Sequence, residues 1–177
     1  MRTTRKSTAV TAAVAAVTAV AGLAVAAGGG TAQASPAPTP ARAAAPSACR
    51  PANHLAKITE GPASSGHTHY RVTLTAPRGY ASCELAGSPT DVRFSHHGTE
   101  TGVTAGRYGS QGGVVTFGPG HPVHFDIQVP SARRGTAADE ASFTLRAPGG
   151  QIPGTSVADG KLSVAPGTLV GPVQRGA

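Results

Sequence analysis

The chain has 177 residues and a formal net charge of +7, with 24 Gly and 15 Pro but only four Phe, three Tyr and no Trp. Beyond residue 34, its Lys and Arg residues stand singly apart from Arg133 and Arg134. Nucleic-acid surfaces combine clustered basic residues with stacking aromatic rings. The composition therefore argues against a nucleic-acid partner.

Residues 1–34 have the pattern of a signal peptide, because MRTTRK carries three positive charges ahead of a long uncharged run of Ala and Val. The run is close to membrane-spanning length, so a membrane anchor is the alternative. The Ala-rich composition and the small residues Ala32 and Ala34 favour cleavage after Ala34. We expect a secreted, extracellular product with no membrane span, in which twelve Lys and Arg face eight Asp and Glu, a net charge of +4.

Residues 35–48 are rich in Pro and Ala, and their four prolines alternate with small residues. Such a segment cannot bury a core and favours an extended tether. We predict a disordered linker here. The chain from Cys49 onward is about the size of one ordinary domain. We assign residues 49–172 to that domain and residues 173–177 to a C-terminal tail.

The domain shows the two-residue hydrophobic period of β-strands. Apolar and polar residues alternate in YRVTLTA (70–76) and HPVHFDIQV (121–129), as they do in half-buried strands. Weaker alternation occurs in HLAKIT, DVRFSH, GVVTF, ASFTLRA and KLSVA, with Gly and Pro turns between these segments. About seven short strands and no sustained helical period predict an all-β domain, folded as an antiparallel sandwich.

Cys49 and Cys83 are the only cysteines in the chain. An exported protein meets an oxidising environment, so we predict a disulfide between them. A redox-active pair is the alternative, but the Cys-x-x-Cys spacing that lowers a thiol pKa is missing. The predicted role of the pair is therefore structural.

The segment CELAGSPTDVRF (83–94) reads as two short strands joined at a corner. Gly87 permits a backbone conformation with positive φ, and Pro89 interrupts strand pairing before DVRF resumes it. We expect the cysteine to fasten the first of these strands and the corner to turn the chain into the second.

This segment resembles the DUF4232 domain of secreted actinobacterial proteins, through Cys, Leu, Gly, Pro, Val and Phe at positions 83, 85, 87, 89, 92 and 94. The strand, Pro-Gly turn and strand at 114–129 and the closing KLSVAP are also similar to that family. Residues 77–79 read Pro-Arg-Gly where the family has Asn-x-Gly, and the second half lacks the family's further cysteines. The resemblance implies an exported Ig-like β-sandwich of unknown function with no catalytic residues. A composition rich in Ala, Gly, Pro and Arg is also typical of a high-GC actinomycete.

The chain carries no recognisable catalytic motif. Gly160-Lys161 is followed by Leu162, and neither a Gly-x-Ser-x-Gly elbow nor Ser-x-x-Lys occurs. Asp139 and Glu140 read as acids of a solvated loop with no opposing carboxylate. We predict a protein that is not an enzyme and needs no cofactor.

The seven histidines suggest a second hypothesis, because imidazole binds zinc and copper. His67 and His69 would share one face of a strand, His121 and His124 flank a proline, and His96-His97 stands near a turn. The first four could form a metal site, or all of these residues could be solvated polar positions at strand ends.

The sequence supports two candidate functions. The first is a secreted non-enzymatic module, with a binding or structural role toward a partner in the cell envelope or outside the cell. The second is an extracellular Zn- or Cu-binding protein that uses His67 and His69, with His121 and His124 as further ligands.

Overall fold

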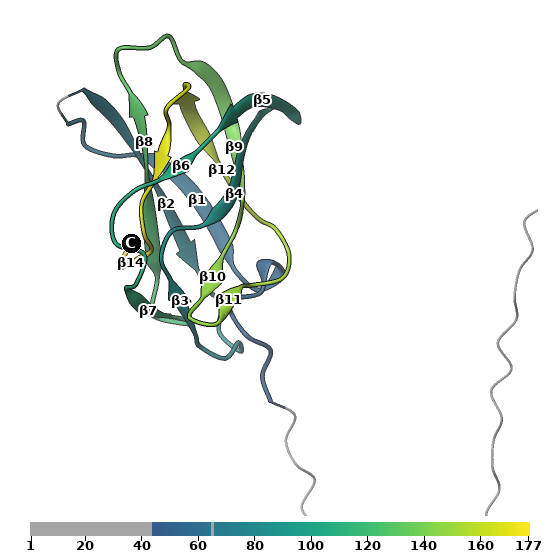
Figure 1. Cartoon of the computed structure of the whole chain (residues 1–177). Helices are drawn as coiled ribbons and strands as arrows, with labels where there is room; N and C mark the ends of the chain where they lie inside the picture. The colour runs from purple at the N-terminus through teal and green to yellow at the C-terminus, as the bar shows by residue number, and fades with distance from the viewer. Residues whose placement is uncertain (1–43, 65) are drawn as a thin grey trace, which may run out of the picture. The chain divides into compact units, whose positions relative to one another are not determined.

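The computed structural model describes residues 44–64 and 66–177 (Figure 1). The predicted signal peptide and the first part of the predicted linker lie outside these residues. Within the described part of the chain, no helix is long and apolar enough to cross a membrane.

The described residues form strands joined by turns, with one short 3-10 turn, η1 (Pro51–Asn53), at the start. The all-β class predicted from the two-residue period is confirmed, and all the predicted strand segments overlap observed strands. The strands are β1 (Leu55–Glu60), β2 (His67–Thr75), β3 (Cys83–Ala86), β4 (Thr90–His96), β5 (Thr99–Thr104), β6 (Gly106–Arg107), β7 (Val114–Phe117), β8 (Val123–Pro130), β9 (Thr136–Thr144), β10 (Arg146–Ala147), β11 (Gly150–Gln151), β12 (Ser156–Val164), β13 (Leu169–Val170) and β14 (Gln174–Arg175).

The main sheet has ten strands and is nearly closed on itself. Its path runs β5-β4-β9-β12-β1-β2-β8-β13-β6, and β14 also pairs with β8. The strands at the two ends of this path, β5 and β6, are separated in the chain only by Ala105, so the sheet curls until its edges come together. Two small sheets, β3-β7 and β10-β11, lie at the end of the domain where the N-terminal segment enters (Figure 1).

The prediction of an antiparallel Ig-like sandwich of about seven strands is confirmed only in its all-β class, because the structure is a mixed sheet that is nearly closed. The structure has more strands, and two pairs in the main sheet are parallel: β1 with β12, and β6 with β13. Alternation along a strand reports which face is buried and carries no information about the direction of the neighbour. Short strands such as β5 and β6 also escaped prediction, because their Gly- and Thr-rich segment has little apolar alternation.

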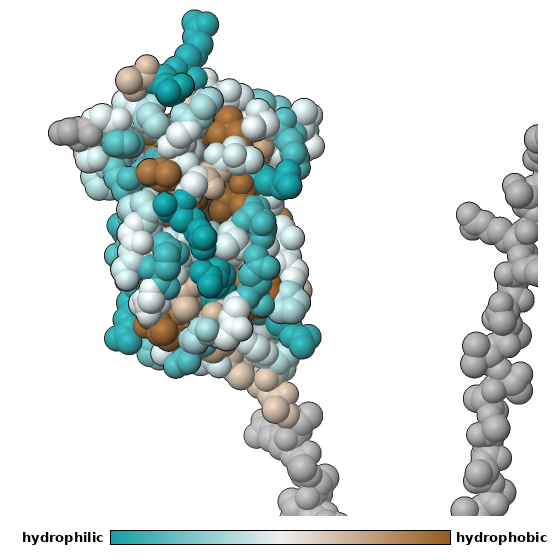
Figure 2. Space-filling view, viewed as in Figure 1, coloured by the Kyte–Doolittle hydropathy of each residue, from teal (hydrophilic) through white to brown (hydrophobic). Residues whose placement is uncertain are grey.

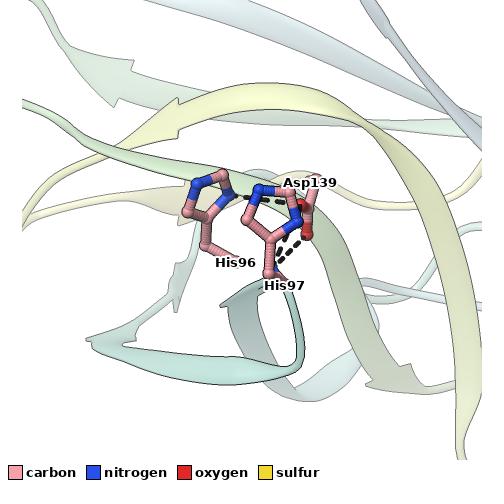
Figure 3. Close-up of side chains that lie close together, drawn as sticks. All are labelled: His96, His97 and Asp139. Carbon is pink, nitrogen blue, oxygen red and sulfur yellow. Dashed lines mark hydrogen bonds and ion pairs between the residues drawn. The ribbon is translucent and has the colours of Figure 1, made fainter.

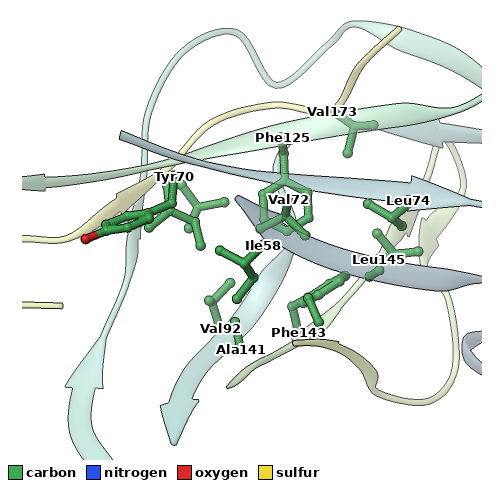
Figure 4. Close-up of a cluster of buried hydrophobic side chains, with 14 of the residues drawn as sticks. Ile58, Tyr70, Val72, Leu74, Val92, Phe125, Ala141, Phe143, Leu145 and Val173 are labelled. Atoms are coloured by element: carbon green, nitrogen blue, oxygen red, sulfur yellow. The ribbon is translucent and has the colours of Figure 1, made fainter. Parts of the chain in front are cut away.

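The core is filled from the inward-facing positions of the long strands. In β2 and β8, Val72 stands opposite Phe125, and both side chains are fully buried. The rings of Phe125 and Phe143 meet edge to face, with centroids 5.1 Å apart. Side chains from β1, β2, β4, β8 and β9 converge in this cluster (Figure 4). All four Phe residues of the chain are buried in the core.

The outer surface carries few large apolar side chains. On the face shown in Figure 2, hydrophobic residues appear as separate spots among hydrophilic and neutral ones. Among the described residues, the exposed large hydrophobic residues are Leu55, Val114 and Val157. Singly exposed apolar residues of this kind are normal for a folded domain.

The predicted disulfide between Cys49 and Cys83 is present, with a Cα–Cα distance of 6.0 Å. It fastens the entering chain to the start of β3. The backbone adds to this connection, because the Ala48 N–H donates to the Ala81 carbonyl oxygen over 2.8 Å and Ser47 forms a parallel bridge with Ala81. Ala48 is fully buried. The end of the predicted linker is therefore part of the fold.

Replacing both cysteines with alanine should lower the free energy of unfolding by about 4 kcal/mol. This is the loop-closure entropy expected for a cross-link of about 35 residues. Urea unfolding followed by circular dichroism would measure the loss in the Cys49→Ala/Cys83→Ala variant. A difference below about 1 kcal/mol would mean that the hydrogen bonds around Ala81 hold this end without the cross-link.

The corner between β3 and β4 depends on Gly87. Its φ is +65°, as the sequence predicted, and a Cβ atom there would lie 2.8 Å from the Gln111 carbonyl oxygen. The Gln111 side chain closes the corner, because its Oε1 accepts from the Ser88 N–H over 2.9 Å and its Nε2 donates to the Ser88 Oγ over 3.0 Å. The Val173 N–H donates to the Gly87 carbonyl oxygen, which ties the C-terminal segment to the same corner.

Gly87→Ala should destabilise the domain by at least about 2 kcal/mol, because it combines a left-handed backbone with a close backbone contact. Gly112→Ala is the matched control, since a Cβ at Gly112 meets nothing within 4 Å and its φ is not positive. The control should stay within about 0.5 kcal/mol of the parent protein in urea unfolding. Equal losses in the two variants would contradict this explanation of the corner.

Candidate functional site

A groove with a volume of about 930 Å³ lies beside the disulfide. Three segments line it: Ser47 with residues 49–52, which enter the fold and form η1; Cys83 and Glu84 at the start of β3; and parts of 147–155, around β10, β11 and the start of β12. The disulfide holds the first two segments together. The groove is therefore assembled from parts of the chain that lie far apart in the sequence.

The walls of the groove are mainly apolar. Pro51, Pro148 and Pro153 contribute rings without backbone N–H donors, and the half-buried Ile152 packs against the core. Arg50 and Glu84 are the charged lining residues, and both are exposed. This combination offers an apolar surface together with one positive and one negative charge.

His54 is a buried side chain that follows η1 and fixes the groove wall to the core. Its Nδ1 donates to the Ala48 carbonyl oxygen over 2.9 Å, since a carbonyl can only accept. Its Nε2 then accepts from the Ser156 hydroxyl over 3.0 Å, and the ring packs edge-on against Phe117 with centroids 5.6 Å apart. Burial lowers the pKa of His54 below its ordinary value of 6.5, and this effect outweighs the backbone hydrogen bonds that raise it.

This burial predicts that the fold loses stability in acid. In the unfolded chain His54 takes up a proton as the pH falls below about 6.5, whereas the folded state resists protonation until a lower pH. The stability is therefore fully present above about pH 6.5 and is lost as the pH falls toward the folded pKa. Urea unfolding at a series of pH values between 8 and 5 would measure this decline.

His54→Asn should flatten that pH dependence, because the amide can still donate to Ala48 but does not titrate. His121→Gln serves as the control at an exposed position and should keep the slope of the parent protein. Parallel stability curves for the parent and His54→Asn would rule out His54 as the source.

The structure places His67 and His69 together on β2, with ring centroids 6.4 Å apart. Both are half-buried, on a strand whose alternate residues face the core. His69 Nε2 forms a hydrogen bond of 2.7 Å with the Ser64 hydroxyl. The predicted sharing of one strand face is confirmed, and the prediction that this pair binds a metal stays a prediction.

The structure does not bring His121 and His124 to this pair. His69 stands opposite Gln128, whereas His124 stands opposite Thr73, four residues further along β2. His124 is buried, and its Nδ1 donates to the Gly176 carbonyl oxygen over 3.1 Å. His121 borders a separate depression of about 440 Å³ that is also lined by Arg175.

A different set of side chains converges at the β4–β5 turn: His96, His97 and Asp139 (Figure 3). Within the described residues it is the one group of three or more His, Cys, Asp or Glu side chains whose ligand atoms lie within 4.8 Å of one another. The sequence placed the two histidines near a turn, which is confirmed. It assigned Asp139 to a solvated loop, which is wrong, because Asp139 lies in β9.

Sequence reasoning missed the position of Asp139 because the alternation of β9 is broken there. Ala138 and Ala141 are both buried although they are three residues apart, and the ladder with β12 is irregular at the same place, between Asp159 and Leu162. A strict two-residue period therefore predicts the second half of β9 but not its first half.

The fold and the groove define the class of protein as an all-β domain that is cross-linked at one end by a disulfide and carries an apolar groove beside it. The family model described as a domain of unknown function, DUF4232, matches residues 49–174. The chain belongs to this family, which confirms the resemblance found in segment 83–94. No curated protein and no solved structure is significantly similar to the chain.

Proposed function

We propose that the protein is an exported, non-enzymatic binding module that holds an extended, mainly apolar peptide segment of a partner in the cell envelope or outside the cell. The observation that carries this proposal is the groove of about 930 Å³ beside the disulfide. Its volume is near the upper end of the range of about 300–1,000 Å³ found for small-molecule pockets, which leaves room for a few side chains of a peptide.

The lining of the groove supports a peptide as the ligand. Its mainly apolar walls suit aliphatic side chains, and Arg50 and Glu84 can fix the direction of a segment by pairing with one acidic and one basic group. Among the described residues, β3, whose first two residues line the groove, has a backbone ladder with β7 alone. We propose that an extended segment adds hydrogen bonds to a strand edge at this end of the domain.

The disulfide supports binding by preorganisation. It links two of the three lining segments and so removes part of the entropy that a flexible groove would lose on binding. We also propose that the domain contacts its partner through loops at the ends of its strands, as Ig-like sandwich domains do. The groove lies among such connecting segments, around η1, β10 and β11.

Export is part of the proposal and is supported by two features: the signal-peptide pattern of residues 1–34 and the disulfide. We also propose an actinobacterial source, which the composition supports. The absence of catalytic activity is likewise proposed. Glu84 and Arg50 are the ionisable groups among the lining residues, and they serve to hold a segment.

A positional-scanning library of N-acetylated octapeptides, screened on the immobilised untagged chain, would test this function. We expect selected peptides to be rich in aliphatic residues and to shift backbone amide NMR signals of residues 47–52, 83–84 and 147–155. Ala52→Glu, which puts a charge against the apolar wall, should weaken the best peptide at least about tenfold in calorimetry.

Ala132→Glu is the matched control, because Ala132 is exposed in the turn between β8 and β9 and does not line the groove. It should leave the affinity unchanged. The proposal fails if no octapeptide binds more tightly than about 1 mM, the weakest affinity of interest for a peptide site, or if the shifted signals map away from the groove.

A further inference from the structure

The His96-His97-Asp139 cluster is a convergence of three metal-ligating side chains from two separate segments. His96 ends β4, His97 begins the turn into β5, and Asp139 lies in the neighbouring strand β9 (Figure 3). The Nδ1 atoms of both histidines lie 3.2 Å from the same carboxylate oxygen, Asp139 Oδ2. None of the three residues lines the groove, so this cluster is a site distinct from the proposed peptide site.

The turn explains how two consecutive histidines reach one point. Neighbouring residues of a strand normally face opposite sides of the sheet. His97 has a φ of +48° and Gly98 a φ of +77°, and His96 pairs with Thr99 across them, which is the two-residue hairpin of the I′ type. This left-handed turn brings the two rings to one side, with centroids 4.1 Å apart.

Asp139 is held in place by the backbone of the same turn. The His97 N–H donates to both carboxylate oxygens of Asp139 over 3.1 Å. This contact orients the carboxylate toward the two imidazoles without using the ring nitrogens. A partner of this kind fixes the geometry of a ligand set before any ion arrives.

The distances suit a tetrahedral ion. Two ligand atoms bound at about 2.0–2.1 Å to a tetrahedral ion lie about 3.3 Å apart. The two His–Asp distances of 3.2 Å match this edge, and the ligand atoms of all three residues lie within 4.8 Å of one another, so an ion can bind between them with little movement of the side chains. Two imidazoles and one carboxylate are ligands of Zn²⁺, Cu²⁺ and Ni²⁺, whereas Ca²⁺ and Mg²⁺ require mostly oxygen ligands.

We propose that His96, His97 and Asp139 bind one divalent late transition-metal ion of the zinc and copper type. His96 Nδ1, His97 Nδ1 and Asp139 Oδ2 are the three protein ligands. The His97 side chain is 82% exposed and that of His96 46%, so water or an external ligand fills the remaining coordination position. The ion joins the β4–β5 hairpin to β9.

The experiment is a calorimetric titration of the untagged, disulfide-bonded chain with ZnCl₂, and in parallel with NiCl₂ and CaCl₂, at pH 7.5. We expect one Zn²⁺ or Ni²⁺ per chain, no Ca²⁺ binding, and a melting temperature that rises with Zn²⁺ concentration, because only the folded state presents the cluster.

Two variants remove one ligand each. His97→Asn keeps a residue that tolerates the left-handed turn, and Asp139→Asn keeps the shape of the side chain without its charge. Each should weaken Zn²⁺ binding at least tenfold. His67→Gln/His69→Gln is the matched control, because it removes two neighbouring histidines of β2 and should leave the affinity unchanged.

With Cu²⁺, electron paramagnetic resonance gives a second readout, because nitrogen couplings report the number of bound imidazoles. We expect two in the parent protein and one in His97→Asn. The proposal is overturned if no stoichiometric binding is found, if His97→Asn binds Zn²⁺ as the parent does, or if binding disappears only in the His67→Gln/His69→Gln control. Should Asp139→Asn fail to fold, His97→Asn at its exposed turn position decides the outcome alone.

Discussion

The pairing of β2 with β8 is the constraint on which the rest of the structure depends. It runs without a register shift from His67 opposite Pro130 to Leu74 opposite Val123, and it sets the inward positions of both strands. The chain has no Trp and only four Phe, and the apolar side chains of these two strands supply much of the core. A slip of one residue would turn the apolar row of one of the two strands outward, so this ladder fixes the register of the sheet around it.

The end of the domain near the disulfide is built differently from this core. The cross-link, the Ala48–Ala81 contact and the buried His54 hold η1 and β3 against the sheet through a few specific interactions. The groove lies between η1, β3 and the 147–155 segment. The features that stabilise this end therefore also shape the proposed binding surface, which joins stability and recognition in one place.

The His96-His97-Asp139 cluster depends on the local conformation of the β4–β5 turn. Strand geometry alone would send His96 and His97 to opposite faces, and the left-handed backbone at His97 reverses this. Strain of this kind is maintained where the surrounding structure determines it, here through the bond from the His97 N–H to Asp139. The cluster and the groove use different segments of the chain, so the metal ion and the peptide that we propose would bind at separate places on the domain.

The sequence by itself determined the strand character of the domain, the Cys49–Cys83 bond and the positive φ at Gly87. Each of these follows from local chemistry: a two-residue period, two cysteines in a chain read as exported, and a glycine at a corner. Strand direction and the near closure of the sheet were decided by tertiary structure, because alternation does not encode which neighbour a strand takes.

The sites show the same division. The histidines of β2 share a face, as their spacing predicted. Asp139 lies beside His96 and His97 only because β9 pairs with β4, which is more than forty residues away in the sequence. The groove likewise has no local signal, since its walls come from three distant segments. Contacts between residues close in the chain could be predicted from the sequence, whereas contacts created by the pairing of distant strands could not.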